Sequence, residues 1–224
     1  MKKIGIITIG QSPRTDVVPE MAAFLGPDVQ ILEAGAIDDL ESKADLAAVA
    51  PQAGETVLVS RLRDGREVLL GEERLLPRIQ ACIHQLEEAE ANPLLLLCTG
   101  RFPPFSHQGL LLEPDRLLVH LVTGVLGTGD KLGVVVPRPE QEAWAREKWA
   151  PTGLTVVTAS GSPYGPPSQV VAAAQQLKEQ APDLIVLDCM GFRAEHKALV
   201  LEHTGIPTLL SNAAVARVLA ELAG

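Results

Sequence analysis

The sequence predicts an α/β protein of two pseudo-symmetric, doubly wound lobes with mainly parallel sheets, the first lobe carrying a β-hairpin insertion. Three observations predict this class. Short continuous apolar runs, which are typical of buried parallel strands, alternate with segments of helical periodicity. The run that begins at Lys3 is echoed by one that begins at Lys131. A second apolar run, ending in a cysteine with a glycine two residues later, also occurs twice, at Cys98 and Cys189.

The individual elements follow from these patterns in chain order. Four apolar runs are expected to be strands: Lys3–Ile9, Leu94–Leu97, Lys131–Val136 and Leu184–Leu187. Apolar residues at three- and four-residue spacing predict helices at Asp16–Leu25, Glu72–Glu90, Gln141–Trp149 and Gln169–Gln180. A shorter strand is expected at Ile206–Leu210, before a final helix. Strands that alternate with helices form right-handed βαβ units and hence a mainly parallel sheet.

The two halves differ in the spacing of their matching residues. Lys3 precedes Cys98 by 95 residues, whereas Lys131 precedes Cys189 by 58, so the first half holds 37 extra residues. We assign this insertion to residues 36–70. There, Asp64-Gly65 separates two strand-like runs, which is a strong signal for a β-hairpin.

The repeat predicts the domain organisation. We expect residues 1–115 together with 210–224 to form the first lobe, residues 116–209 the second, and an active cleft between them. Proline-rich loops follow three of the strand-like segments and could line the mouth of that cleft. They could equally be ordinary loops, since proline is common wherever a loop must not pair.

Composition excludes several classes of function. The net charge of −9 over 224 residues argues against a nucleic-acid partner, which would require a basic face. No apolar run approaches the ~20 residues of a membrane span, and the first residues lack the pattern of a signal peptide. Three cysteines form no disulfide framework, and no Cys-x-x-Cys or Cys/His spacing supplies a zinc site. We therefore expect a soluble, reduced, cytoplasmic protein with no metal and no cofactor.

The two repeated cysteines are the main candidates for chemistry. In an open α/β sheet, ligands bind just past the carboxyl ends of the strands, which is where Cys98 and Cys189 are expected. Two thiols that face each other across a cleft could exchange protons with carbon without any cofactor. The alternative is that each thiol is inert core filler, as is expected for Cys82 within its helix.

The first strand-to-helix turn is a candidate anion site. Small polar residues and glycine in Gly10–Thr15 present N–H groups and the Ser12 hydroxyl, and Arg14 adds a fork that fits a carboxylate. Alternatively, Ser12 is a helix N-cap with Pro13 at the first helical position. The two interpretations are compatible.

Further polar residues gather at predicted strand ends. The backbone N–H groups of Thr99 and Met190, with Gly100 and Gly191 beyond them, could hold a carboxylate. Asn212 is either a ligand contact or an N-cap. Weaker candidates beside the predicted cleft loops are Arg61, Tyr164 and Lys197, and His107 or His196 could tune a thiol. Asp188 is expected to point to the opposite face from Cys189, or toward a helix N-terminus.

Several segments, in order along the whole chain, resemble the AroM family. They are Thr8-Ile9-Gly10 with Pro13-Arg14, Pro51-Gln52-Ala53-Gly54-Glu55, Ser60-Arg61-Leu62, Leu112-Glu113-Pro114, Leu187-Asp188-Cys189-Met190-Gly191-Phe192 and Leu210-Ser211-Asn212. This resemblance brings no established reaction with it. More distantly, the two lobes and two cysteines are similar to the aspartate/glutamate/hydantoin racemase superfamily.

The distant resemblance implies a reaction. By analogy, one of Cys98 and Cys189 removes the proton from a carbon α to a carboxylate and the other returns a proton on the opposite face, while Thr99, Met190 and the Ser12 loop hold the carboxylate. The residues that follow the cysteines differ from those usual in the racemases. A single-cysteine decarboxylase or isomerase, and a carboxylate-binding or sensor protein without turnover, therefore stay as alternatives. The inserted hairpin makes a homodimer a reasonable expectation.

Overall fold

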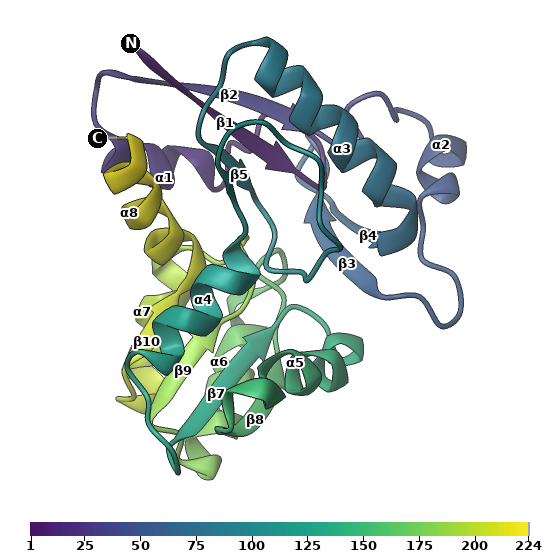
Figure 1. Cartoon of the computed structure of the whole chain (residues 1–224). Coiled ribbons are helices and arrows are strands. Elements are labelled where there is room, and N and C mark those ends of the chain that lie inside the picture. Colours follow the sequence, from purple (N-terminus) through teal and green to yellow (C-terminus); the bar gives the residue numbers. More distant parts are fainter. Residues whose placement is uncertain (224) are drawn as a thin grey trace. The chain divides into compact units, whose positions relative to one another are not determined.

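The computed structural model describes residues 1–223, which form two compact units. Unit 1 comprises residues 1–114 and 216–223, and unit 2 comprises Asp115–Val215. The predicted boundaries lay at 115 and 210. The final helix α8 (Ser211–Ala223) contains the second boundary: it starts in unit 2, and its residues from Ala216 onward belong to unit 1. Each unit is built around its own sheet (Figure 1).

Unit 1 contains a four-stranded parallel sheet of order β2-β1-β5-β6. Its strands are β1 (Lys2–Thr8), β2 (Val29–Gly35), β5 (Leu94–Leu96) and β6 (Leu111–Leu112). Helix α1 (Val18–Leu25) connects β1 to β2, and α3 (Glu72–Glu88) packs along β1 and β2. One face of this sheet, α3 and the insertion share a core that includes Ile7, Ile79 and Leu96.

The insertion in unit 1 is confirmed as a hairpin with its own two-stranded antiparallel sheet. Strand β3 (Val57–Arg61) pairs with β4 (Glu67–Gly71) around Asp64-Gly65, and Gly65 has the positive φ of 95° that this turn needs. A short helix, α2 (Lys43–Ala48), precedes it and is capped by the Ser42 side chain. The hairpin forms no ladder with the main sheet of the unit.

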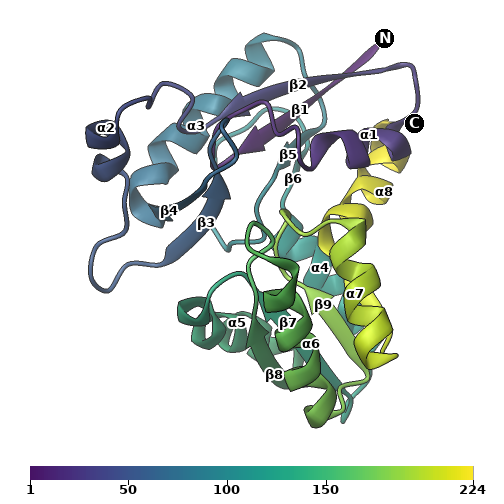
Figure 2. The same ribbon diagram turned by 180° about the vertical axis from the view of Figure 1, so that it is seen from behind.

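Unit 2 repeats the plan with a parallel sheet of order β10-β9-β7-β8. Its strands are β7 (Lys131–Val136), β8 (Thr155–Ser160), β9 (Leu184–Leu187) and β10 (Thr208–Leu210). Its helices are α4 (Pro114–Thr123), α5 (Glu142–Trp149), α6 (Pro167–Gln180) and α7 (Ala194–Thr204), with 3₁₀ turns η1 (Pro139–Gln141) and η2 (Ala150–Thr152). Seen from behind in Figure 2, α6 and α7 lie side by side, and they share a core with one face of the sheet.

The two sheets have the same topology, which confirms the predicted pseudo-repeat. In each unit the strand that comes first in the chain lies between the second and the third, with the fourth outside the third. The register also matches: Gly5 pairs with Leu94 and Ile7 with Leu96, as Gly133 pairs with Ile185 and Val135 with Leu187. In this order the connections leave the first and third strands toward opposite sides, and in open α/β sheets of this kind ligands generally bind at the carboxyl ends of those strands.

Several elements depart from the prediction. Helix α1 begins at Val18 rather than Asp16, and Pro19 lies in its first turn. Strands β2, β6 and β8 and helices α2, α4 and α7 were not predicted. Because β2 and β8 are sheet edges, they are only partly buried and carry polar residues such as Glu33 and Thr158, which hides the apolar run.

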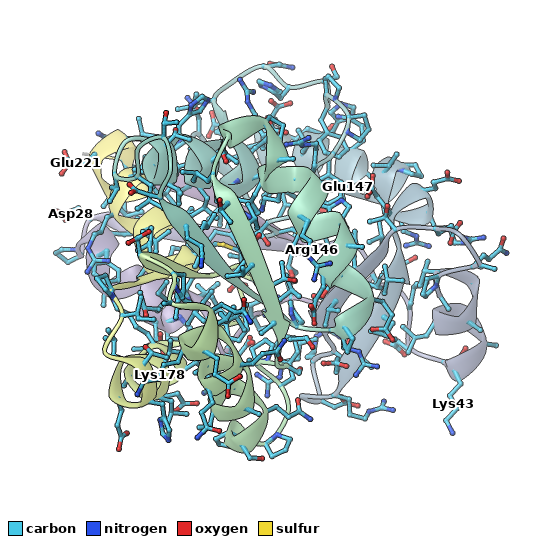
Figure 3. The ribbon with its side chains drawn as sticks, turned by 90° about the horizontal axis from the view of Figure 1, so that it is seen from below. Asp28, Lys43, Arg146, Glu147, Lys178 and Glu221 are labelled. Carbon is cyan, nitrogen blue, oxygen red and sulfur yellow. The ribbon has the colours of Figure 1, made fainter. Side chains whose placement is uncertain are left out.

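Charged side chains cover the surface. Lys43, labelled in Figure 3, extends away from the ribbon, whereas the Lys178 ammonium donates to the His203 carbonyl at 2.9 Å. Within residues 1–223, no helix combines the length and apolar character required to cross a bilayer.

Candidate active site

Each cysteine leaves its strand through the same turn. The Leu97 N–H donates to the Ile7 carbonyl at 2.7 Å, and the Asp188 N–H donates to the Val135 carbonyl at 2.9 Å. The next N–H folds back onto its own chain: Cys98 donates to Leu96 O at 2.8 Å and Cys189 to Leu187 O at 3.0 Å. A three-residue turn therefore ends β5 and β9 alike and projects a cysteine from each.

Both sulfur atoms accept a backbone hydrogen bond from the glycine two residues later. Gly100 N lies 3.3 Å from Cys98 Sγ, and Gly191 N lies 3.4 Å from Cys189 Sγ. Both side chains are half-buried reduced thiols that pack against the core of their own unit. An N–H aimed at sulfur favours the anionic form that reacts as a base or nucleophile. The two units thus present their cysteines in the same backbone setting.

Cys82 shows what a structural thiol looks like in the same molecule. It lies within α3 and belongs to the core of unit 1, as predicted. Burial raises the pKa of the Cys82 thiol to about 11. At neutral pH this thiol stays protonated, so it serves as the inert reference for the other two.

Gly191, two residues after Cys189, is closely approached by the Tyr164 side chain. A Cβ atom on Gly191 would lie 2.2 Å from the Tyr164 hydroxyl and 2.6 Å from the ring carbon that bears it. A Cβ on Gly100 would instead meet Phe102 at 3.2 Å and Cys98 Sγ at 3.3 Å. Tyr164, from the loop after β8, therefore lies directly over the residue that donates to Cys189.

Asn212 and Ser211 hold the loop that carries Cys189. The Asn212 carboxamide donates to Phe192 O at 2.6 Å and to Met190 O at 3.4 Å, and so brackets Gly191. The Ser211 hydroxyl donates to Leu187 O at 2.6 Å. Asn212 lies within the first turn of α8 and does not precede it, so it is not the N-cap. Its Oδ1 is buried without a hydrogen-bond partner among the described residues.

The side chain of Asp188 points toward α5. Its two carboxylate oxygens accept from Lys148 Nζ at 2.9 and 3.0 Å, and Oδ2 also accepts from Trp149 Nε1 at 3.0 Å. Lys148 also lies 3.5 Å from Asp115 Oδ1. Asp188 was expected to point either to the face opposite Cys189 or toward a helix N-terminus. It takes the first direction, and its partners are the last residues of α5.

In unit 1, Arg14 is buried against a carboxylate of its own loop. Its Nε and Nη2 donate to the two oxygens of Asp16, each at 2.9 Å, and Nη1 donates to Thr8 Oγ1 at 3.1 Å. Burial alone would raise the pKa of Asp16, but the hydrogen bonds and charge of Arg14 outweigh it and hold that pKa below its ordinary value. Arg61 reaches the same carboxylate at 3.6 Å and keeps 30% of its side chain exposed.

The Ser12 N-cap interpretation is wrong. The Ser12 hydroxyl and N–H both donate to Asp38, each at 2.6 Å, and α1 begins six residues later. Asp38 also accepts from Arg63 of the hairpin at 3.0 Å, and Arg63 Nε donates to Ser12 O at 2.7 Å. Ser12 therefore bonds to the Asp38 carboxylate in the loop after β2 and not to the N–H groups of α1. The hairpin braces this loop.

The histidines have structural partners. His196 Nδ1 accepts from Arg193 N at 2.9 Å in the capping box of α7, and its ring packs edge-on against Phe192. Burial lowers the pKa of His196, and the Arg193 charge adds to this while Glu195 opposes it. His107 Nδ1 lies 2.8 Å from Gly109 O.

The structure thus brings the predicted residues together in sets. Unit 2 brings together five of the predicted residues: Cys189, Met190, Gly191, Asn212 and Tyr164. In unit 1 the predicted run Cys98-Thr99-Gly100 is joined by the hydrogen bond from Gly100 N to Cys98 Sγ. Arg14 and Arg61 share Asp16, and Ser12 joins a neighbouring group around Asp38.

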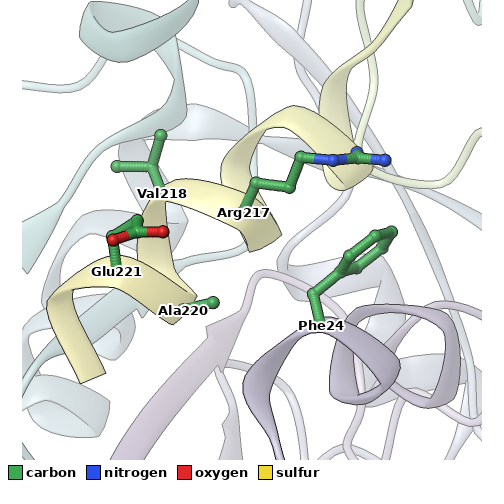
Figure 4. Close-up of a pocket in the computed structure, with 5 residues that line it drawn as sticks. All are labelled: Phe24, Arg217, Val218, Ala220 and Glu221. Carbon is green, nitrogen blue, oxygen red and sulfur yellow. The ribbon is translucent and has the colours of Figure 1, made fainter. Parts of the chain in front are cut away.

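Other features of the described residues stand apart from these sets. No cluster of three or more His, Cys, Asp or Glu side chains in residues 1–223 is placed to hold a metal ion. A surface hollow of about 340 Å³ in unit 1 is lined by α1 and α8 residues and contains no predicted site residue (Figure 4). In it, the Arg217 guanidinium lies 4.3 Å from the centre of the Phe24 ring.

Sequence reasoning missed the residues that support the site. Lys148, Asp38 and Arg63 were not predicted, although each holds a predicted loop or its neighbour. For Lys148 a signal was present, because a lysine next to a tryptophan in an amphipathic helix is unusual on a buried face.

Comparison with known proteins places this geometry in context. The model of the family described as AroM protein matches residues 4–223. None of the curated proteins compared with the chain matches its sequence. Among solved structures, Picrophilus torridus aspartate racemase is similar, with 12% identity, a TM-score of 0.62 and coverage of 100% of this chain and 95% of that one.

Two further similar structures are of enzymes named for different reactions. An unliganded arylmalonate decarboxylase has 16% identity and a TM-score of 0.61, covering 100% of this chain and 94% of its own. The maleate isomerase Iso of Pseudomonas putida S16 has 11% identity and a TM-score of 0.61, covering 98% and 92%. The shared feature is the fold, a two-lobe arrangement of parallel sheets.

Proposed function

Since the chain belongs to the AroM family, and its fold is that of racemases, isomerases and decarboxylases, we propose that it is a cofactor-independent enzyme acting at a carbon α to a carboxylate. Cys189 is the acid–base group and Cys98 its counterpart. One observation carries the proposal: the two thiols leave equivalent strands through equivalent turns, and each accepts an N–H from the glycine two residues later.

The chemistry balances without a cofactor. In racemisation or epimerisation, the thiolate of one cysteine takes the α-proton, and the electron pair left on carbon spreads into the carboxylate. The thiol of the other cysteine then gives its proton to the opposite face. In decarboxylation, the bond to the departing CO₂ breaks instead, its electron pair stays on the α-carbon, and one thiol protonates that carbon. The second course needs only one cysteine.

The proposed ligand contacts differ in kind. We assign the carboxylate of the substrate to the backbone N–H groups of Thr99 and Met190 and to the partly exposed Arg61, while the N–H groups of Gly100 and Gly191 stay with the two sulfur atoms. The Ser12 and Arg14 side chains, already engaged by Asp38 and Asp16, shape the loop beside it. Tyr164 and Asn212 complete the surroundings of Cys189. A homodimer in a reducing cytoplasm remains the expected setting of this enzyme.

A second candidate is a carboxylate-binding protein without turnover. The observation that favours it is the sequence that follows each cysteine, Thr99-Gly100 and Met190-Gly191, which differs from the Asn-Thr and Thr usual in the racemases it resembles. Function does not follow from fold alone. The two candidates are therefore distinguished by whether a bound ligand reacts at its α-carbon.

The test is incorporation of deuterium from deuterated water at the α-carbon, either by exchange of the α-proton or by replacement of the lost CO₂, followed by NMR on a panel of amino acids, 2-hydroxy acids and arylmalonates. Ligands are first selected by thermal shift. Cys189→Ser is expected to slow exchange by about 10²–10⁴-fold, the usual contribution of a positioned acid–base group. Cys98→Ser is expected to do the same for a racemase and much less for a one-thiol decarboxylase.

The matched control is Cys82→Ala, which removes the inert thiol and is expected to retain full exchange. Exchange that survives in both single variants at Cys98 and Cys189 contradicts the thiol mechanism. A ligand that binds tightly but neither exchanges its α-proton nor loses CO₂ supports the binding protein instead.

A further inference from the structure

A buried ion pair lies directly behind Cys189. Asp188 is the central residue of the turn that releases Cys189 from β9, since the Cys189 N–H folds back to Leu187 O. The side chains of Asp188 and Lys148 have no exposed surface, and the Lys148 ammonium contacts both carboxylate oxygens. Trp149 Nε1 adds a third hydrogen bond to the same carboxylate.

The groups around the ion pair fix the orientation of the Asp188 carboxylate. Lys148 Nζ lies 5.5 Å from the Trp144 ring centre and 5.3 Å from that of Trp149, so two aromatic rings flank the ammonium. Asp115, at the start of α4, faces the same ammonium from another element. The carboxylate of Asp188 is thus held at both oxygens from a single helix, and its orientation is set within a narrow range.

Stability alone does not account for such a pair. Removing two charges from water costs about as much as their attraction returns, and well-packed apolar residues of similar volume often serve as well or better. The same molecule provides the comparison. In unit 1 the equivalent residue of the equivalent turn is Leu97, whose apolar side chain belongs to a residue that is only 2% exposed. The turn therefore forms without an ion pair.

We propose that the Lys148–Asp188 pair is a positioning device for Cys189, which anchors the turn so that the Cys189 sulfur stays aligned with the Gly191 N–H. This inference rests on the proposed function only in assuming that the reactivity of Cys189 matters. Asp188 and Lys148 touch no substrate; they act through the direction in which Cys189 leaves β9. Trp149 belongs to the same device through its hydrogen bond to Asp188.

The test measures the reactivity of Cys189 in the full chain, with Cys82→Ala and Cys98→Ser as background so that one thiol remains. The rate of alkylation by iodoacetamide is followed against pH, and the thermal midpoint is measured in parallel. The key variant is Lys148→Met/Asp188→Leu, which gives this turn an apolar anchor like that of unit 1. We expect a thermal midpoint within a few degrees of the background, because the charges are removed together.

The same double variant is expected to move the midpoint of the alkylation profile upward by about one pH unit, with a roughly tenfold slower reaction at neutral pH. Trp149→Phe removes only the indole hydrogen bond, keeps the aromatic bulk, and is expected to change the profile in the same direction by less. It also keeps the test valid if the double variant does not fold.

The matched control uses Cys98 as the single thiol, in a background of Cys82→Ala and Cys189→Ser. There, Trp149→Phe and the double variant are expected to leave the Cys98 profile unchanged. An unchanged Cys189 profile in the folded variants overturns the proposal and makes the pair merely structural. Alkylation needs no substrate, so this result is independent of whether the protein exchanges any α-proton.

Discussion

The turns that carry Cys98 and Cys189 have the same backbone and different anchors. In unit 1 the central residue of the turn is the buried, apolar Leu97, and ion pairs around Asp16 and Asp38 lie in the loops after β1 and β2. In unit 2 the charges lie directly beneath the turn, between Asp188 and Lys148. The backbone of this turn forms without an ion pair in unit 1. We therefore attribute the pair in unit 2 to the positioning of Cys189.

The same comparison extends to the loops beyond the cysteines. Asn212 clamps both carbonyls around Gly191 in unit 2, and Tyr164 lies over that glycine. Around Gly100 the nearest groups are Phe102 and the sulfur of Cys98 itself. Unit 2 therefore holds the loop after its cysteine with the Asn212 carboxamide and the Tyr164 side chain. This difference makes Cys189 the better candidate for the indispensable thiol.

The largest effect is expected from breaking the ion pair on one side only. Lys148→Met leaves the Asp188 carboxylate buried without its cation, which should lower the free energy of unfolding by about 3–5 kcal/mol. Adding Asp188→Leu should recover most of that loss. Urea unfolding followed by circular dichroism measures both variants. A single variant as stable as the parent would mean that water or another group replaces the ammonium, and the two turns would then be equivalent.

An intermediate effect is expected from adding a methyl group at the two glycines. Gly191→Ala forces the Tyr164 ring to move, because the new Cβ would lie 2.2 Å from its hydroxyl, and should cost about 1–3 kcal/mol. Gly100→Ala meets its neighbours at 3.2–3.3 Å and should cost less than about 1 kcal/mol. Thermal unfolding of both variants gives the comparison. Equal losses would show that the two loops are equally tight.

The smallest effect is expected from acid, which should destabilise unit 2 at a higher pH than unit 1. Burial lowers the pKa of His196 below 6.5, so the folded state binds fewer protons than the unfolded chain, and its stabilisation of unit 2 is lost as pH falls below about 6.5. The lowered pKa of Asp16 keeps its contribution to unit 1 until pH falls below about 3.8.

Hydrogen exchange followed by mass spectrometry at pH 7.5 and 5.5 measures this difference, after correction for intrinsic rates. Protection should fall first in α7 and the residues around Phe192, while β1 and α1 stay protected. His196→Gln keeps an acceptor for the Arg193 N–H and should remove most of the change. Loss of protection in α1 before α7 would contradict the assignment.

Sequence patterns predicted the central strands of each sheet and the edge strand β10, and missed the edge strands β2, β6 and β8. Strands β7 and β9 have the predicted bounds, because a strand with neighbours on both sides is apolar throughout. Edge strand β2 carries Gln30 and Glu33 and shows no such run. The repeat of cysteine and glycine was sufficient to predict equivalent strand ends, since those positions follow directly from the register.

The parts of the site that depend on long-range contacts were out of reach. The partner of Asp188 lies 40 positions away on α5, and Asp38, which takes the Ser12 hydroxyl from its expected role as a cap, lies 26 positions away. Local rules rank serine before proline as a helix start, but they cannot include a carboxylate from another loop. The predicted ligand roles of Ser12, Arg14 and the other site residues stay predictions until a ligand is found.

Helix α8 determines the order in which the chain can become complete during synthesis. Its first residues, Ser211 and Asn212, secure the Cys189 loop, and its later residues from Ala216 onward supply Leu219 and Ala223 to the interior of unit 1. Unit 2 is one continuous stretch, so all of its residues are present once Val215 has been translated. Unit 1, although its first strand is made first, must wait for residues that are translated after unit 2. The lobe begun earliest is therefore the last to be finished.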